Sequence, residues 1–256
     1  MGSDLNIKFY DELSEDYHLI FDDWESAVTG QAKTLDNIIR HFTKTEPVTL
    51  LDCACGIGTQ AIGLANLGYQ VQATDLSPKA VARARVEADR LNVALSFGVA
   101  DFKTLNTDVE GTFDVVIACD NALPHLLDKA DLLLAAANIL SKMKPGGVFL
   151  ASIRDYDKVL EQKPLSTQPT IKETGDQRAI SFQIWDWTED NVYTVNHFML
   201  KGKDENFHTS LRTTKYKAYQ RSEMTAIFEK AGYTGIKWLM PDESGYYQPV
   251  LIARKA

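Results

Sequence analysis

One stretch, residues 48–67 (VTLLDCACGIGTQAIGLANL), constrains the fold of this chain more than any other. Its first residues, VTLL, form a short apolar run of the kind that makes a strand in a buried parallel sheet. Gly56 and Gly58 follow, and a helical pattern of apolar residues begins directly after them. Glycines allow the main chain to approach a ligand closely, and the start of a helix offers free N–H groups. The stretch therefore predicts a strand–turn–helix unit that binds a nucleotide-like ligand.

The same glycine pattern, Gly56-x-Gly58-x-x-Ala61, also fits the fingerprint of dinucleotide-binding folds, in which a pyrophosphate sits on the helix end. Asp52, at the end of the predicted strand, favours a different ligand. A carboxylate there suits a cationic group, such as the ammonium of a methionine moiety, and NAD-binding folds usually lack an acid at that place. Two alternatives stay open: a dehydrogenase, or an ordinary turn in which Asp52 caps the helix.

Length, charge and cysteine content limit the class of protein. The 256 residues suffice for one large α/β domain, and the net charge of −8 argues against nucleic-acid or acidic-membrane partners. Cys53, Cys55 and Cys119 indicate no disulfide framework and no metal site, and buried reduced thiols are typical of a reducing compartment. No signal peptide or apolar run of membrane-spanning length occurs. We expect a cytoplasmic monomer or homo-oligomer with a small-molecule substrate.

The N-terminal part, residues 5–46, is predicted to be helical and amphipathic, with a second helix near residues 31–42. Tyr10, Tyr17 and Trp24 recur seven residues apart, so they share one face if the helix is continuous. Their periodicity favours core packing, and the alternative is a lid of aromatic rings over a cationic sulfonium or amine.

Further strands are expected to bring acidic residues to one edge of the sheet. The predicted strands are residues 69–74, 92–99, 113–119 and 148–153, with helices at 77–91 and 129–143. Ligands of such sheets bind beyond the carboxyl ends of the strands. Asp75 ends the second strand, where an acid accepts hydrogen bonds from both ribose hydroxyls. Asp101 follows the third strand and suits the adenine amino group, while Phe102 packs on the ring; a simple strand-end acid is the alternative.

Polar residues also follow the fourth and fifth strands. Asp120, Asn121 and His125 are site candidates by position, although His125 is expected to start a helix or pack. Arg154 follows the fifth strand, and arginine suits bidentate binding of a carboxylate. The alternative for Arg154 is a surface ion pair with one of the aspartates in the sequence RDYD.

Residues 160–218 break the alternation of strands and helices. Three aromatic and β-branched runs, at residues 179–187, 191–200 and 209–219, predict an inserted antiparallel sheet that covers the active site. A helix at 222–231 and strands near 234–239 and 248–254 complete the chain. We predict a doubly wound, Rossmann-like, mainly parallel seven-stranded sheet with this inserted β lid and N-terminal helices. The expected divisions are a cap at 1–46, a main domain at 47–158 and 219–256, and the lid at 159–218.

The ordered set of motifs resembles class I S-adenosylmethionine (SAM)-dependent methyltransferases over about residues 48–153. The motifs that carry this resemblance are Asp52…Gly56-x-Gly58, Asp75, Asp101-Phe102, Asp120-Asn121 and Lys144-Pro145-Gly146-Gly147. Four segments, LDCACGIGTQAIGLANLGYQV, DNALPHL, SIRDYDKVL and FYDELSEDYHLIFDDW, further resemble the glycine and sarcosine N-methyltransferases. Lys33 stands where that branch tends to have Arg, and Asp120 where it often has Gly.

The resemblance implies SAM as cofactor and glycine, sarcosine or dimethylglycine as acceptor. The residues it implies for the cofactor are Tyr17, Trp24, Lys33, Asp52, Ala54, Gly56, Gly58, Asp75, Leu76, Asp101, Phe102 and Asp120. Those it implies for the acceptor are Asn121, Arg154 and Tyr216, with Arg154 on the carboxylate. Methyl transfer to an oxygen or carbon acceptor, and a non-catalytic SAM-binding protein, are the alternatives.

Overall fold

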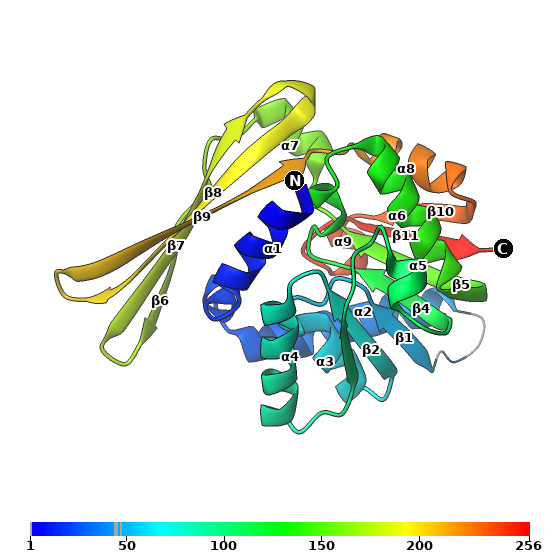
Figure 1. Ribbon diagram of the computed structural model, residues 1–256, viewed down its shortest axis with the longest axis horizontal. Helices are drawn as coiled ribbons and strands as arrows, with labels where there is room; N and C mark the ends of the chain where they lie inside the picture. Colours follow the sequence, from blue (N-terminus) through cyan, green and yellow to red (C-terminus); the bar gives the residue numbers. More distant parts are fainter. Residues whose placement is uncertain (1, 44–45, 47) are drawn as a thin grey trace.

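The computed structural model of this chain describes residues 2–43, 46 and 48–256. Its centre is a seven-stranded sheet with the strand order β10-β11-β5-β4-β1-β2-β3 (Figure 1). The strands are β1 (Thr49–Asp52), β2 (Gln70–Asp75), β3 (Ser96–Val99), β4 (Phe113–Ala118), β5 (Met143–Ser152), β10 (Tyr233–Leu239) and β11 (Val250–Lys255). β1 to β5 run parallel, and β11 runs antiparallel to both of its neighbours. The predicted mainly parallel, doubly wound sheet is confirmed.

Helices cover both faces of this sheet, because successive strand residues point to opposite sides. Leu50, Val115 and Leu150 pack in one buried cluster with α2 (Trp24–Phe42) and α3 (Thr59–Asn66). Leu51 and Phe149 pack in another cluster. That cluster includes residues of α5 (Leu105–Asp108), α6 (Lys129–Ser141) and α8 (Arg221–Lys230). No helix within the described residues is long and apolar enough to cross a bilayer.

The turn between β1 and α3 needs glycine for two different reasons. Gly56 (φ 51°) and Gly58 (φ 94°) both adopt left-handed backbone conformations, which side chains with a Cβ disfavour. At Gly58 a Cβ atom would also lie 2.7 Å from Cδ1 of Ile62. The backbone of Gly58 therefore packs closely against the first turn of α3, which leaves no room for a side chain at this position.

A second, four-stranded antiparallel sheet projects away from the main body (Figure 1). It consists of β6 (Thr170–Thr174), β7 (Gln177–Trp187), β8 (Val192–Lys203) and β9 (Asn206–Lys217). The inserted antiparallel sheet is confirmed, but β6 was not among the predicted strands. Its sequence, TIKET, holds a single large apolar residue, Ile171, which is exposed, so no hydrophobic pattern marks the strand.

The N-terminal segment is broken into three elements: α1 (Gly2–Leu13), the 3₁₀ turn η1 (Tyr17–Ile20) and α2. The segment is therefore not one continuous helix, and Tyr10, Tyr17 and Trp24 do not share one helix face. In Figure 1, α1 lies between the two sheets, where it contacts β9 and α4 (Pro78–Arg90). Asp11 fixes it there by accepting hydrogen bonds from the Ser77 hydroxyl (2.6 Å) and the Lys79 amide (3.1 Å).

Two predicted boundaries also differ from the structure. The sequence Lys144-Pro145-Gly146-Gly147 was expected to stop a helix, but α6 already ends at Ser141 and these residues fall within β5. The pairing between β4 and β5 shifts register there, and Gly146 has a φ of 74°, so the segment forms an irregular start of the strand. The third strand begins at Ser96 instead of residue 92, because Asn92 adopts a left-handed turn conformation.

Candidate active site

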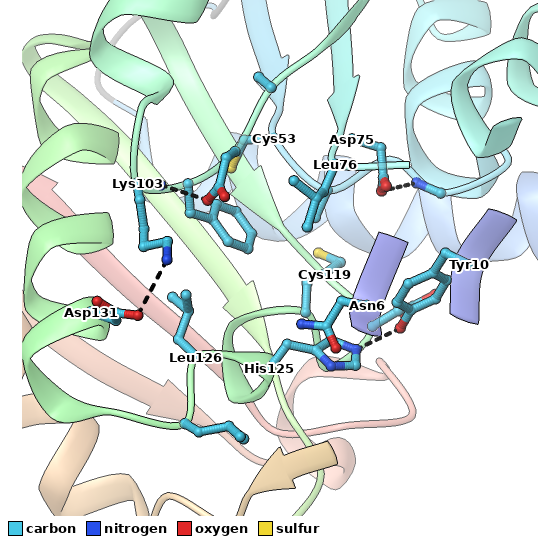
Figure 2. Close-up of a pocket in the computed structure, with 18 of the residues that line it drawn as sticks. Asn6, Tyr10, Cys53, Asp75, Leu76, Lys103, Cys119, His125, Leu126 and Asp131 are labelled. Carbon is cyan, nitrogen blue, oxygen red and sulfur yellow. Dashed lines mark hydrogen bonds and ion pairs between the residues drawn. The ribbon is translucent and has the colours of Figure 1, made fainter. Parts of the chain in front are cut away.

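A first cavity of about 310 Å³ lies at the carboxyl ends of the central strands (Figure 2). Eight of the predicted cofactor residues line it: Tyr17, Ala54, Gly56, Asp75, Leu76, Asp101, Phe102 and Asp120. Tyr17 comes from η1, Asp75 is the last residue of β2, and the others come from the segments after β1, β2, β3 and β4. The cavity forms because parallel strands end at the same edge of the sheet.

Asp75 is held at the edge of the first cavity by main-chain hydrogen bonds. One of its carboxylate oxygens accepts a hydrogen bond from the Gly56 amide (2.8 Å), and the other accepts one from the Ser77 amide (2.9 Å). Burial raises the pKa of Asp75, and these N–H donors oppose that effect by favouring the ionised form. The Asp75 carboxylate thus connects the glycine turn to the end of β2.

The opposite side of the first cavity is formed by residues after β3 and in α6. Figure 2 shows Lys103 and Asp131 across the cavity from Asp75, and their side chains form an ion pair of 3.4 Å. The Lys103 amide donates a hydrogen bond to the Asp101 carboxylate (2.9 Å), which fixes the turn that carries Phe102. This side of the cavity therefore combines an acid with an aromatic ring.

Four predicted cofactor residues do not line either of the cavities described here. Trp24 is core: its indole N–H donates a hydrogen bond to Thr59 (2.9 Å) beneath the glycine turn. Lys33 is exposed, because α2 buries the face that carries Ala32 and Leu35, and Lys33 lies outside that face. Gly58 packs against Ile62 of α3, as described above. Asp52 is buried below the cavity wall, where it accepts a hydrogen bond from the Ala54 amide (3.1 Å).

Burial raises the pKa of Asp52 to about 8, helped by the nearby charges of Asp75 and Asp120. In the unfolded chain this carboxyl ionises near pH 4, so the unfolded state loses its proton first. The contribution of Asp52 to the free energy of unfolding is therefore lost as pH rises from about 4 to about 8. We expect Asp52→Asn to unfold at a higher temperature than the wild type at pH 8, by a margin that shrinks at pH 5. Thermal unfolding at both pH values tests this; an equal margin at both would mean that Asp52 is ionised in the fold.

A second cavity of about 390 Å³ adjoins the first beneath α1 and the inserted sheet. It contains the three residues predicted for the acceptor, Asn121, Arg154 and Tyr216. Tyr10, Tyr17 and Asp120 line both cavities. A ligand in one cavity therefore lies next to a ligand in the other.

Arg154 is positioned in the second cavity by neutral groups. Its guanidinium donates hydrogen bonds to the Tyr193 hydroxyl (2.8 Å) and to the Gln183 side chain (3.3 Å). It also stacks over aromatic rings, with Cζ 5.0 Å from the ring centre of Tyr216. The alternative ion pairs do not form, since Asp155 and Asp157 both bind Arg221. Over the described chain, no acidic oxygen lies within 4.0 Å of Arg154, so its charge is not compensated.

The turn after β4 ties this strand to the end of β5. Asp120 (φ 59°) and Asn121 (φ 65°) are consecutive residues in the left-handed region, which Asp and Asn adopt more readily than most residues other than glycine. The Asn121 amide donates a hydrogen bond to the Ser152 carbonyl (2.9 Å), and the Asn121 side-chain oxygen accepts one from the Arg154 amide (3.1 Å). These bonds place Asn121 and Arg154 side by side.

Residues that sequence reasoning missed complete the site from distant parts of the chain. The Asp120 carboxylate accepts hydrogen bonds from Gln60 (2.8 Å), Tyr246 (2.9 Å) and Tyr247. Gln60 lies within the glycine-turn segment but at a variable position of its pattern, Tyr246 and Tyr247 belong to no motif, and only the fold brings the three together. Gln183 and His197, on adjacent strands of the inserted sheet, also line the second cavity.

His125 holds α1 against the site. Its imidazole is hydrogen-bonded to the Tyr10 hydroxyl (2.8 Å) and to the Lys215 carbonyl (3.1 Å), as Figure 2 shows for Tyr10. Burial lowers the pKa of His125 to about 3, so the ring is neutral at physiological pH. It therefore anchors Tyr10 without adding charge to the cavity.

Comparison with known proteins identifies related sequences. Residues 50–147 match a family model described as a methyltransferase domain. A glycine/sarcosine N-methyltransferase of Parasynechococcus marenigrum is 31% identical over 160 residues, which are 61% of this chain and 57% of that relative. A ubiquinone biosynthesis O-methyltransferase of Xanthomonas campestris is 35% identical over 103 residues, 40% of this chain and 41% of the relative. This chain thus spans about half the length of these curated relatives.

A solved structure resembles nearly the whole chain. The SAM-bound amino pentose methyltransferase from Micromonospora echinaspora aligns with a TM-score of 0.72 at 20% identity, over 90% of this chain and 92% of that chain. At this identity the likeness concerns the fold. The chain therefore shares the Rossmann-like fold of that structure, and its residues 50–147 match the model of a methyltransferase domain.

Proposed function

We propose that this chain, with its methyltransferase domain at residues 50–147, is a SAM-dependent N-methyltransferase that acts on a small amine bearing a carboxylate. Glycine, sarcosine and dimethylglycine are the proposed acceptors. The observation that carries the proposal is the uncompensated guanidinium of Arg154 in a cavity that adjoins the first one. A partly buried cation without an acidic partner favours an anionic ligand, and a carboxylate matches the geometry of a guanidinium.

The residues of the first cavity fit SAM. Asp75 offers carboxylate oxygens at the end of β2, where a ribose would lie, and Phe102 offers an aromatic surface for adenine. Ala54 and Gly56 present main chain with little side-chain bulk, as close approach to a ligand requires. SAM, when bound, supplies a methyl group activated on a sulfonium.

In this proposal the chain contributes mainly positioning. Arg154 orients the acceptor by its carboxylate, so that the amine faces the first cavity at near-attack distance. Tyr10 and Tyr17, which line both cavities, exclude water from the space between the two ligands. The leaving group is a neutral thioether, so no general acid is needed to expel it. The amine, however, must first lose a proton.

The character of the second cavity supports a polar acceptor over the alternative oxygen or carbon acceptor. The inserted sheet contributes Gln183, His197 and Tyr216 to the wall, all of which carry hydrogen-bonding groups. A polar acceptor can form additional hydrogen bonds with these groups, which an apolar acceptor cannot.

We expect the purified protein to methylate at least one of glycine, sarcosine and dimethylglycine. Methylamine lacks the carboxylate, so we expect kcat/KM for methylamine to be roughly 100-fold lower. Transfer of label from methyl-labelled SAM, with phenols, thiols and nucleobases as further acceptors, measures both. Turnover of a phenol or thiol alone would contradict the substrate class, and failure of SAM or S-adenosylhomocysteine to bind in calorimetry would contradict the cofactor. NADH in the same titration tests the dehydrogenase alternative.

A further inference from the structure

Asp120 occupies the boundary between the two cavities. It lines both of them, which only a residue at their junction does. Its carboxylate has hydrogen-bond donors, but within the described part of the chain no cationic side chain lies within 4.0 Å of it. The Asp120 carboxylate is therefore held in place by neutral donors alone.

The second cavity contains this anion together with the cation of Arg154. The two do not pair with each other, since no ion pair joins them among the described residues. Tyr17 lines the same cavity, and both charges act on its phenol: apart from burial, Asp120 raises its pKa and Arg154 lowers it. One cavity thus has two side chains of opposite charge, Asp120 and Arg154, in its lining. A zwitterionic ligand, with an ammonium and a carboxylate, complements both.

Resting on the proposed function, we propose that Asp120 binds the ammonium group of the acceptor and takes one of its protons before methyl transfer. The N–H bond breaks, its electron pair stays on nitrogen, and the proton bonds to a carboxylate oxygen of Asp120. The freed electron pair then forms the N–C bond to the methyl group as the S–C bond breaks, and the methylated ammonium is released. Asp120 returns its proton to water, so each turnover releases one proton.

The local environment suits a carboxylate that gains and loses a proton. Burial raises the pKa of Asp120, and the donors Tyr247, Gln60 and Tyr246 oppose this. A carboxylate with a raised pKa is a better base than one in water, and its three donors favour the ionised form. These donors also hold the Asp120 carboxylate in one orientation.

Most other titratable groups around Asp120 do not change charge near neutral pH. Burial raises the pKa values of Cys119, Tyr17 and Tyr246 well above their usual ranges, so these groups stay neutral, and Tyr247 does likewise. Burial lowers the pKa of His125 to about 3 and that of His197 to about 4, so both imidazoles are also neutral. Among the described neighbours, Asp52, with a pKa of about 8, titrates in the working range. The test is therefore repeated in an Asp52→Asn background.

The test compares Asp120→Asn with the wild type between pH 6 and pH 10. Asparagine keeps the shape of the side chain and tolerates the left-handed backbone, so the turn is retained. We expect kcat/KM for the acceptor to fall on the order of 30-fold at pH 7, because an ammonium must then lose its proton to water. The deficit shrinks as pH approaches the pKa of the amine, since free amine needs no base. The Kd for SAM changes by less than about 3-fold.

A second variant, Tyr247→Phe, removes one donor to the Asp120 carboxylate. The ionised form loses stabilisation, so the pKa of Asp120 rises and the acid limb of the kcat/KM profile moves to higher pH. A purely structural role of Asp120 would leave that limb in place. An unmoved limb, or a loss in Asp120→Asn that is equal at every pH, overturns the inference. An equal loss of SAM affinity also overturns it, by assigning Asp120 to the cofactor.

These outcomes separate the inference from the proposed function. If amines without a carboxylate are methylated as well as glycine and still show the pH-dependent loss in Asp120→Asn, the proposed acceptor class fails and the role of Asp120 stands. If the carboxylate-bearing amines are methylated and the loss does not depend on pH, the inference alone fails. If no amine is methylated, both fail.

Discussion

Replacing Asp75 with alanine is expected to weaken SAM binding about 100-fold. If the carboxylate of Asp75 accepts hydrogen bonds from both ribose hydroxyls, the variant loses two bonds to a charged acceptor, at about 1.5 kcal/mol each. Their sum of about 3 kcal/mol corresponds to two orders of magnitude in Kd. The variant also leaves the amides of Gly56 and Ser77 without their carboxylate partner, which loosens the glycine turn. Calorimetric titration with SAM and with S-adenosylhomocysteine measures the loss.

A matched control separates loss of the ligand contact from loss of stability. Asp114 is also a strand acid that holds main chain, since it accepts hydrogen bonds from the Thr49 amide (2.9 Å) and hydroxyl (2.7 Å). It lies at the other end of β4, away from both cavities. We expect Asp114→Ala to lower the unfolding temperature while the Kd for SAM stays within about 3-fold of the wild type. Similar affinity losses in Asp114→Ala and Asp75→Ala would mean that Asp75 acts through the fold alone.

The positions of these acids show what local sequence determines. A buried strand followed by an acid and a glycine turn specifies both where the strand ends and which edge of the sheet the acid occupies. Asp75, Asp101 and Asp120 were therefore placed correctly at the edge that forms the cavities. The location of Arg154 at this edge was predictable for the same reason, because Arg154 closely follows the end of β5. Strand ends are predictable because the topology of a parallel sheet brings them together.

The remaining features depend on contacts that no local pattern encodes. Tyr246 lies 126 residues from Asp120, and its hydrogen bond forms only because β11 pairs with β5. The N-terminal aromatic residues have a regular spacing, yet tertiary contacts divide their segment into α1, η1 and α2. Asp52 fits the cofactor pattern by position, but its side chain turns inward to the Ala54 amide. In each case packing overrides a periodicity or motif that is correct in isolation.

Arg154→Ala is expected to raise KM for the acceptor roughly 300-fold while the Kd for SAM stays nearly unchanged. Truncating one partner of a hydrogen-bonded charge pair costs about 2–5 kcal/mol, and the middle of that range corresponds to this factor. Arg154→Lys keeps the charge but loses the bidentate geometry and the stacking on Tyr216, so we expect an increase of about 20-fold. Initial-rate kinetics with both substrates varied, together with calorimetry for SAM, measure these changes.

The interpretation of the Arg154 variants depends on showing that the effect requires the acceptor carboxylate. Methylamine serves as the internal control, because its low turnover should be the same in wild type and Arg154→Ala. Arg221→Ala is the structural control: it breaks the ion pairs with Asp155 and Asp157 next to Arg154 but lines neither cavity. A similar rise in KM in Arg221→Ala would assign the effect to the loop after β5. An equal loss with methylamine would show that Arg154 does not act on a carboxylate, and the acceptor class would have to be sought among amines that lack a carboxylate.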